Sequence, residues 1–256
     1  MTSAPVLLNA VAFRAPRKIC AFGDAVQALA TGGPATLPRE RDLRAGRRWW
    51  TVREQPAGST SSLALALADS VIRWHLVETG RLRTDEPLSP GFLEMASDLT
   101  GEWGHTRRRL RAVLEAARRF GCVREADLSE AIGLPEGEAN RLLFARATRY
   151  RIATYISLGA DDFTAWRRWL VRFGPILTWL HVDRAWQDAS ATRAALDHHE
   201  GAAAAPAQAV AVVGYRADGR FIVRNSWGSA WGDGGHAYVS EAYARAAFME
   251  GYGLAV

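Results

Sequence analysis

A run of hydroxyl side chains supplies the candidate nucleophiles of this sequence. The stretch Gly58-Ser59-Thr60-Ser61-Ser62 directly precedes an apolar segment. A hydroxyl is a poor nucleophile at neutral pH unless a neighbouring base takes its proton. Such a base would have to come from elsewhere in the chain, and His198 and His199 are the candidates. Ser59, Thr60 or Ser61 paired with one of them would form an unconventional hydrolase or acyltransferase.

The same residues also have simpler structural interpretations, which we favour. Serine and threonine are preferred N-cap residues, so Gly58 to Ser62 predicts the start of a helix over Ser62 to Val77. Paired histidines on a polar loop are typical of solvated surface residues, and they would bind a metal only if a third ligand converged on them. His236 is expected to have a packing role.

The two cysteines predict neither a disulfide framework nor a zinc site. Cys20 and Cys122 lack the paired Cys/His spacing of zinc ligands. We therefore expect a reduced protein without metal or other cofactor. Cys122 follows Phe120-Gly121 and is expected to be a buried structural thiol.

Composition predicts one globular domain with two lobes. The chain has 256 residues, of which 48% are hydrophobic and 23% charged, enough to bury a core without disulfides. Its net charge of +5 comes from arginine, since Lys18 is the only lysine. The arginines between Arg107 and Arg119 alternate with apolar residues in a helical pattern, which favours a solvated helix face over a nucleic-acid site.

Nothing in the sequence predicts a membrane segment. No apolar run approaches the roughly 20 residues that a membrane helix needs, and Met1 to Leu8 lacks the pattern of a secretory signal. We therefore expect a cytoplasmic protein. Residues 1–36, with a strand-like piece at Pro5 to Phe13, are expected to form an N-terminal extension to a main domain at 37–256.

Periodicity divides the main domain into a helical first part and a strand-rich second part. Helices are predicted at Ser62 to Val77, Pro90 to Leu99, Thr106 to Phe120, Glu136 to Ala147 and Asp161 to Phe173. Strands are predicted at Arg149 to Ser157, Pro175 to His181, Ala209 to Val213, Phe221 to Arg224 and His236 to Val239.

Several short motifs occur in a shared order that resembles the papain-like cysteine peptidases, particularly their compact bacterial members. They are Leu37-Pro38, Val52-Arg53-Glu54-Gln55, Leu88-Ser89-Pro90-Gly91-Phe92-Leu93, Tyr150-Arg151-Ile152, Ala209 to Tyr215, and Arg224-Asn225-Ser226-Trp227-Gly228 through Gly235. The resemblance covers nearly everything after Leu37. It implies an α+β papain-like fold, with a helical N-terminal lobe, a β-barrel-like C-terminal lobe and the active-site cleft between them.

The resemblance also assigns roles to positions in this sequence. In the family, a cysteine thiolate is paired with a histidine, an asparagine orients that histidine, and a glutamine donates to the oxyanion. Gln55 and Asn225 match the last two roles. Thr60 or Ser61 stands where the family has its cysteine, and Gln208 stands 17 residues before Asn225 where the family has histidine.

Loss of both reactive residues predicts a pseudopeptidase. A glutamine amide cannot shuttle protons, so Gln55 and Asn225 are expected to be structural, with Asn225 bonded to Gln208 and Trp227 covering the pair. The cleft would still bind a peptide or protein, through the vestigial positions and Gly58, Ser59, Ser61, Ala209 and Trp227. A partner that uses the lobe surfaces instead is a further possibility.

Overall fold

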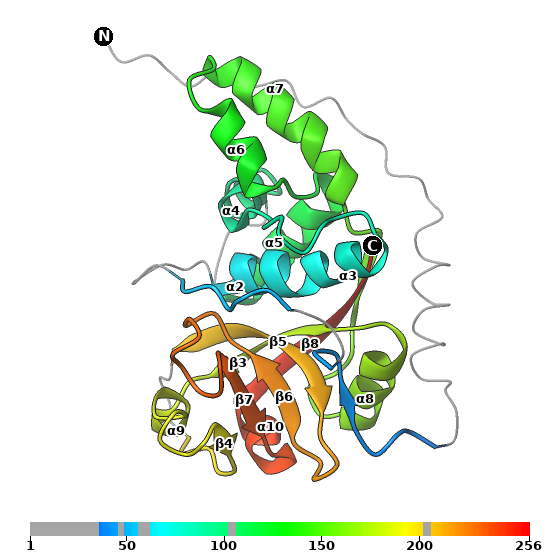
Figure 1. Ribbon diagram of the computed structural model, residues 1–256, viewed down its shortest axis with the longest axis vertical. Coiled ribbons are helices and arrows are strands. Elements are labelled where there is room, and N and C mark those ends of the chain that lie inside the picture. The colour runs from blue at the N-terminus through cyan, green and yellow to red at the C-terminus, as the bar shows by residue number, and fades with distance from the viewer. Residues whose placement is uncertain (1–35, 46–48, 56–61, 102–105, 202–205) are drawn as a thin grey trace.

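The computed structural model describes residues 36–45, 49–55, 62–101, 106–201 and 206–256, and these form two lobes, one of helices and one built on a sheet (Figure 1). The predicted α+β two-lobe fold is therefore confirmed. The predicted extension at 1–36 lies almost entirely outside the described residues. In the described part of the chain, no helix is long and apolar enough to span a membrane.

The first lobe consists of helices that the sequence pattern largely anticipates. Its elements are α2 (Ser62–Leu65), the π-helix η1 (Ala66–Ile72), α3 (Arg73–Glu78), α4 (Pro90–Asp98), α5 (Thr106–Arg119), α6 (Glu125–Ala131), α7 (Glu136–Ala147) and the 3₁₀ helix η2 (Thr148–Tyr150). Helix α4 begins at a cap, because Ser89 Oγ accepts a hydrogen bond from the Phe92 N–H at 3.2 Å and Pro90 follows directly.

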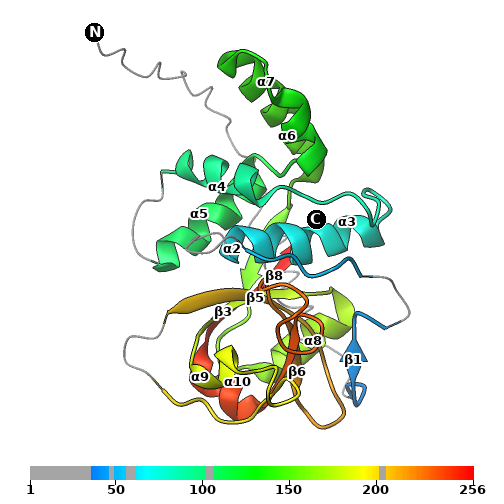
Figure 2. The ribbon, with the colours of Figure 1, turned by 60° about the vertical axis from the view of Figure 1, so that its left-hand side comes forward.

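Helices α2, η1 and α3 form one continuous central helix. It lies between helices α4 and α5 on one side and the sheet on the other (Figures 1 and 2). Because both sides of this helix are covered, its own apolar residues lie on all of its faces. Leu67, Val71 and Ile72, for example, have no exposed surface. The predicted helix over Ser62 to Val77 matches this central helix to within one residue.

The second lobe is built on an eight-stranded mixed sheet. Its strands are β1 (Arg41–Asp42), β2 (Thr154–Ser157), β3 (Ile176–His181), β4 (Ala195–Leu196), β5 (Ala207–Tyr215), β6 (Phe221–Arg224), β7 (His236–Val239) and β8 (Phe248–Ala255). The order is β2-β8-β3-β5-β6-β7-β4, with β1 paired to β5, and only the β4–β7 pair is parallel. Among the described strands this path is open, so the lobe is a mixed sheet rather than a closed barrel.

Three short helices complete this lobe: α8 (Phe163–Arg172), α9 (Arg184–Gln187) and α10 (Glu241–Ala247). Trp166 and Trp169 on α8 pack against β8 at Gly251 and Gly253. A Cβ atom on either glycine would lie within 2.4 Å of an indole ring. The large tryptophan rings thus require glycine at these two positions of β8. Because glycine is uncommon in strands, the sequence of β8 lacks the usual strand pattern.

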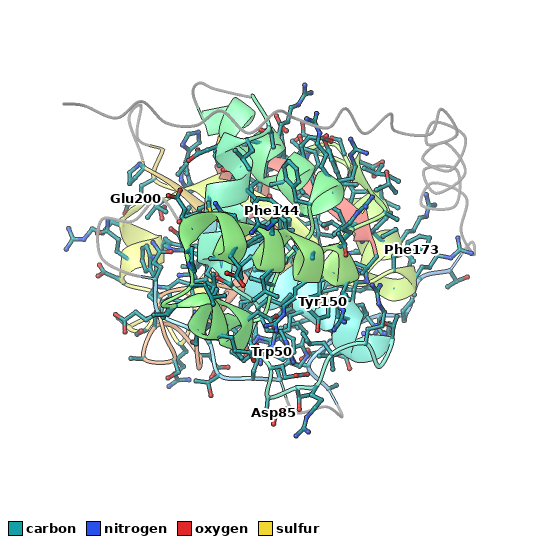
Figure 3. The ribbon with its side chains drawn as sticks, turned by 90° about the horizontal axis from the view of Figure 1, so that it is seen from above. Trp50, Asp85, Phe144, Tyr150, Phe173 and Glu200 are labelled. Carbon is teal, nitrogen blue, oxygen red and sulfur yellow. The ribbon has the colours of Figure 1, made fainter. Side chains whose placement is uncertain are left out.

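The hydrophobic core has a separate part in the sheet lobe and a part shared by both lobes. The shared part joins Leu63 and Leu67 of the central helix to Trp179 of β3 and Ala211 of β5. A smaller cluster holds the α6–α7 hairpin, where Phe144 packs against Phe92 and Phe120. Seen from above, helix α7 with Phe144 lies across the top of the molecule (Figure 3).

Two of the predicted strands have clearly different bounds in the structure. The strand predicted at Arg149 to Ser157 begins only at Thr154, because the residues before it end helix α7 in a 3₁₀ turn. Strand β5 is longer than predicted, since it starts at Ala207 and ends at Tyr215. The N-terminal strand-like piece, Pro5 to Phe13, lies outside the described residues.

Candidate functional site

Gln55 is placed by a short antiparallel pairing with the loop that follows β6. The Gln55 N–H donates to the Ser226 carbonyl at 2.8 Å, and the Gly228 N–H donates to the Arg53 carbonyl at 3.3 Å. The bridge between Glu54 and Trp227 lies between these bonds. Backbone hydrogen bonds therefore hold the predicted glutamine beside the predicted asparagine loop.

The glycines of this loop permit that approach. Gly235 has a φ of +87°, and its carbonyl accepts from the Asn225 N–H at 3.0 Å. A Cβ atom at Gly235 would lie 2.5 Å from a Val52 methyl group. Only glycine combines this positive φ with contact to the segment leading to Gln55.

Gln208 lies at the centre of a buried group of amide and hydroxyl side chains. Its Nε2 is 3.0 Å from each of three oxygens: Gln55 Oε1, Asn225 Oδ1 and Ser226 Oγ. The Ser226 hydroxyl donates in turn to Gln55 Oε1 at 2.6 Å. We call these four residues the amide network. The predicted hydrogen bond between Gln208 and Asn225 is present.

The amide network is arranged to hold a geometry and not to move protons. Gln208 and Asn225 are 4% and 3% exposed, and their carboxamides do not ionise near neutral pH. Two hydrogens on Gln208 Nε2 face three acceptors, so the nitrogen is fully engaged. Asn225 Nδ2 is buried and has no hydrogen-bond partner among the described residues.

The other predicted site residues fall into two groups. The Ala209 N–H donates to Ser62 Oγ at 3.4 Å, but the Ala209 side chain is 1% exposed and packs in the core shared by the lobes. Its backbone, not its side chain, therefore faces this junction. Gly58, Ser59, Thr60 and Ser61 lie outside the described residues.

Trp227 is half-buried and belongs to a cluster of indole rings. Its ring centroid is 6.4 Å from that of Trp186 and 5.8 Å from that of Trp231, both edge-on. These contacts anchor the residue that follows the amide network. That Trp227 also covers Gln208 and Asn225 stays a prediction.

A buried ionic cluster adjoins the amide network through Arg224, the residue before Asn225. We define it as Asp69, Arg73 and Arg224. Asp69 Oδ1 accepts from Arg73 Nη1 at 2.7 Å, and Arg224 Nη2 is 3.6 Å from Asp69 Oδ2. All three side chains are at most 4% exposed. Trp50 completes the cluster, since its Nε1 donates to Asp69 Oδ2 at 3.0 Å and its ring lies 4.1 Å from the Arg73 guanidinium carbon.

The ionic cluster joins the three segments that carry the predicted site. Asp69 and Arg73 lie on the central helix, Arg224 ends β6, and Arg224 Nη2 donates to the carbonyls of Trp50 and Thr51 at 3.1 and 3.3 Å. Two buried cations share one carboxylate, so these carbonyls supply part of the compensating charge. Burial lowers the pKa of Arg224 to about 10.

The hydrogen bonds that the structure gives for the histidines do not involve the amide network. His199 Nε2 lies 3.1 Å from the His181 carbonyl oxygen, and its Nδ1 accepts from the Gly201 N–H at 3.2 Å, while His198 is exposed. His236 is buried, and burial together with Arg224 lowers its pKa to about 4. Among the described residues, no group of three or more His, Cys, Asp or Glu side chains is placed to hold a metal ion.

Cys122 is a buried thiol, as predicted. It has no exposed surface, its Sγ donates to the Ser89 carbonyl at 3.4 Å, and burial raises its pKa to about 12. A thiol with so high a pKa is unreactive at neutral pH. The described cysteine is therefore no candidate for a nucleophile.

Sequence reasoning missed Ser226 and the ionic cluster. Ser226 stands beside Asn225 and gave no signal of its own. Asp69 and Arg73 could have been found, because an acidic and a basic residue four apart interrupt an otherwise apolar helix. Buried charges at such positions must be paired.

Comparisons with known proteins agree with this geometry. Residues 137–252 match the model of the papain family of cysteine proteases. The fold is similar to xylellain, a cysteine protease from Xylella fastidiosa, with a TM-score of 0.67 and 18% identity over 90% of this chain and 89% of that one. It is also similar to digestive procathepsin L 3 of the Tenebrio molitor larval midgut, with a TM-score of 0.64 and 18% identity over 91% and 79% of the two chains.

A third similar structure is the Carica candamarcensis cysteine protease CMS1MS2 in complex with E-64, with a TM-score of 0.59 and 17% identity over 86% of this chain and 99% of that one. No curated protein sequence matches the chain. The protein therefore has the papain-like fold, and residues 137–252 are similar to the papain family of cysteine proteases.

Proposed function

We propose that the protein is a catalytically inactive papain-like homologue that binds a peptide or protein partner in its vestigial cleft. The observation that carries this proposal is the state of Gln208. An amide occupies the position of the family's base, and its hydrogens are engaged by Gln55, Asn225 and Ser226. A side chain that neither gains nor loses a proton cannot act as general base.

Retention of the surrounding geometry favours binding over simple decay of the site. Gln55 is still fixed by backbone pairing to Ser226, and Asn225 still faces residue 208. Because Gln55 Oε1 accepts from within the network, its Nε2 donors are not used there. They would suit a carbonyl of a bound polypeptide, which presents such acceptors along its backbone.

A binding selection tests this proposal. A phage-displayed random dodecapeptide library would be selected on the purified protein, and enriched peptides measured by fluorescence anisotropy. We expect Ser59→Trp to weaken binding at least about tenfold, which is about 1.4 kcal/mol. The matched control is Ser129→Trp, at an exposed position on α6, which should bind as wild type. Equal binding by both variants would refute the cleft model.

The alternative is a Ser- or Thr-dependent hydrolase or acyltransferase. It needs a base near Ser59, Thr60 or Ser61, and the hydrogen bonds of His199 tie its ring to the His181 carbonyl and the Gly201 N–H instead. A fluorophosphonate probe separates the two functions. A covalent adduct on Gly58 to Ser62 would support the hydrolase, whereas an unlabelled protein that still binds peptides would support the binding role.

The cellular setting remains a proposal as well. We propose a cytoplasmic protein whose partner is a polypeptide and not a nucleic acid. Many of the arginines are already used within the fold: Glu115 holds Arg118 and Arg119, and Asp127 holds Arg124 and Arg146. These four described arginines are therefore engaged by carboxylates of the fold rather than free for phosphates.

A further inference from the structure

The α6–α7 hairpin presents an apolar tip with an acidic border. We define the tip as Ile132 and Leu134 with Glu130, Glu136 and Glu138. Ile132 is 82% exposed and Leu134 is 36% exposed. All three glutamates are exposed as well; Glu130 is paired with Arg146 Nη1 at 2.5 Å, and Glu136 and Glu138 form the outward acidic border.

The tip is held rigidly although it projects from the molecule. The hairpin is fixed by Asp127, which pairs with Arg124 at 2.8 Å and with Arg146 at 3.0 Å. The turn itself is closed by the hydrogen bond from the Leu134 N–H to the Ala131 carbonyl at 3.2 Å. A bulky apolar side chain is therefore presented to solvent in a fixed position, which suits a contact surface.

The sheet lobe carries a cavity with the complementary character. We call it the arginine pocket. It has a volume of about 600 Å³, and it is lined by Glu40, Arg41, Asp42, Arg44, Ala45, Tyr215, Arg216, Ile222 and Tyr238. The guanidinium carbons of Arg44 and Arg216 lie 5.9 and 4.7 Å from the centre of the Tyr238 ring.

The pocket is lined by three arginines and by two acids, Glu40 and Asp42. Asp42 is already bound by Arg44, whose Nε and Nη2 donate to its carboxylate at 3.0 and 2.8 Å. Arg41 is exposed, and Arg216 is half-exposed, 3.8 Å from Asp218. Tyrosine and arginine, which line this pocket, are among the residue types enriched in protein interfaces.

Tip and pocket lie at opposite ends of one molecule and cannot meet within it. Both ribbon views place the α6–α7 hairpin at one extreme of the long axis and β1, with the adjoining ends of β5 and β6, in the other lobe (Figures 1 and 2). A contact between the two surfaces must therefore join two molecules. Because the surfaces differ, it would be head-to-tail and could propagate.

We propose that the tip of one molecule docks in the arginine pocket of a second copy of this chain. Ile132 enters the pocket beside Ala45 and the edge of Tyr238, and Glu136 and Glu138 of the tip face Arg41 and Arg216. Charge complementarity selects this occupant: the tip presents Glu136 and Glu138 on a protein whose net charge is +5, and three arginines against two acids line the pocket. The proposal is independent of the cleft and its chemistry.

Sedimentation velocity on the full chain tests the pairing. Wild type is expected to show a mass that rises with protein concentration at low salt and falls back to the 28.0 kDa monomer at high salt. Ile132→Asp removes the tip, and Arg216→Glu removes the pocket. Each variant alone should stay monomeric. An equal mixture should form a pair of twice the monomer mass, since each partner keeps one intact surface.

Two matched variants guard against unrelated effects. Leu99→Asp changes an apolar side chain that is 59% exposed but not part of the tip, and Arg245→Glu changes a half-exposed arginine outside the pocket. Both should associate as wild type, and circular dichroism should show all four variants folded. A wild type that is monomeric at every concentration, or a mixture that fails to pair, would overturn the proposal.

Discussion

The amide network and the ionic cluster lie next to each other, but the first buries neutral polar side chains and the second buries charged ones. In the amide network, Gln55, Gln208, Asn225 and Ser226 are hydrogen-bonded to each other without any ionisable group, and the buried Asn225 Nδ2 is left without a partner among the described residues. One residue away, Arg224 begins a cluster that buries three charges. The difference indicates that buried charge is kept where it joins segments, whereas the neighbouring network consists of neutral side chains.

The energetic consequences of the two arrangements should differ accordingly. Removing one member of a buried ion pair leaves an uncompensated charge, whereas removing a neutral hydrogen-bonding partner leaves only unsatisfied dipoles. Substitutions in the two regions therefore provide a direct way to test whether the comparison holds.

The largest effect is expected for Asp69→Ala. The substitution would leave Arg73 and Arg224 buried without their carboxylate, at a cost of about 3–5 kcal/mol in the free energy of unfolding. Urea denaturation measures it. The control is Asp85→Ala, whose ion pair with Arg83 is exposed and screened by solvent, so its loss should change the stability little. An equal loss of unfolding free energy in both variants would contradict the role of the ionic cluster as a buried contact between segments.

A pH dependence of stability sharpens the comparison at His236, which is buried near Arg224. Its pKa is lowered from 6.5 to about 4, chiefly by burial and then by Arg224 and Arg44. Between these two pH values, His236 therefore binds a proton in the unfolded chain but not in the folded protein. Stability should be lost as the pH falls from about 6.5 to about 4, by up to about 3 kcal/mol.

His236→Gln provides the comparison curve. The difference in unfolding free energy between wild type and this variant should change across that pH range and stay constant above about pH 7. A flat difference would contradict the proposed burial of a neutral imidazole. The amide network contributes nothing to this dependence, because its side chains do not titrate.

A smaller loss is expected for Gln208→Ala. It leaves acceptors on Gln55, Asn225 and Ser226 without their shared donor, at a cost of about 1–3 kcal/mol. Gln208→His introduces a ring N–H that can donate to Asn225 in place of the amide, so this variant should retain most of the stability. Thermal denaturation of the two variants decides this, and a larger loss for histidine than for alanine would contradict the network.

The smallest effect is expected for Ser226→Ala. This substitution removes one hydroxyl that donates to Gln55, and a single neutral hydrogen bond contributes about 0.5–1.5 kcal/mol. Ser229→Ala, at an exposed position in the same loop, is the matched control and should be within about 0.5 kcal/mol of wild type. Indistinguishable melting curves would place Ser226 outside the network.

Helical periodicity predicted most of the first lobe, because its helices bury one face or, in the central helix, all faces. It missed α6, whose seven residues are too short for a periodic pattern. Strand β8 was missed because Gly251 and Gly253 make room for tryptophan rings from α8. Here a tertiary contact, absent from any local pattern, decides the residue type.

The site was predicted only in part. The order of motifs identified Gln55, Gln208 and Asn225, and the structure brings these three side chains together. The contribution of Ser226 depends on the backbone pairing of two segments about 170 residues apart, which no local signal reveals. The buried cluster of Asp69 and Arg224 likewise depends on how the lobes meet.

The central claim is that the site keeps its geometry without its chemistry, and a peptide-library digest read by mass spectrometry tests it most directly. Three proteins would be compared: wild type, the triple variant Ser59→Ala/Thr60→Ala/Ser61→Ala, and the variant Thr60→Cys/Gln208→His. We predict no cleavage by wild type and detectable cleavage by the Cys/His variant, since Asn225 and Gln55 are already in place. Cleavage by wild type that the triple variant loses would contradict this account and establish a hydrolase that uses a hydroxyl nucleophile.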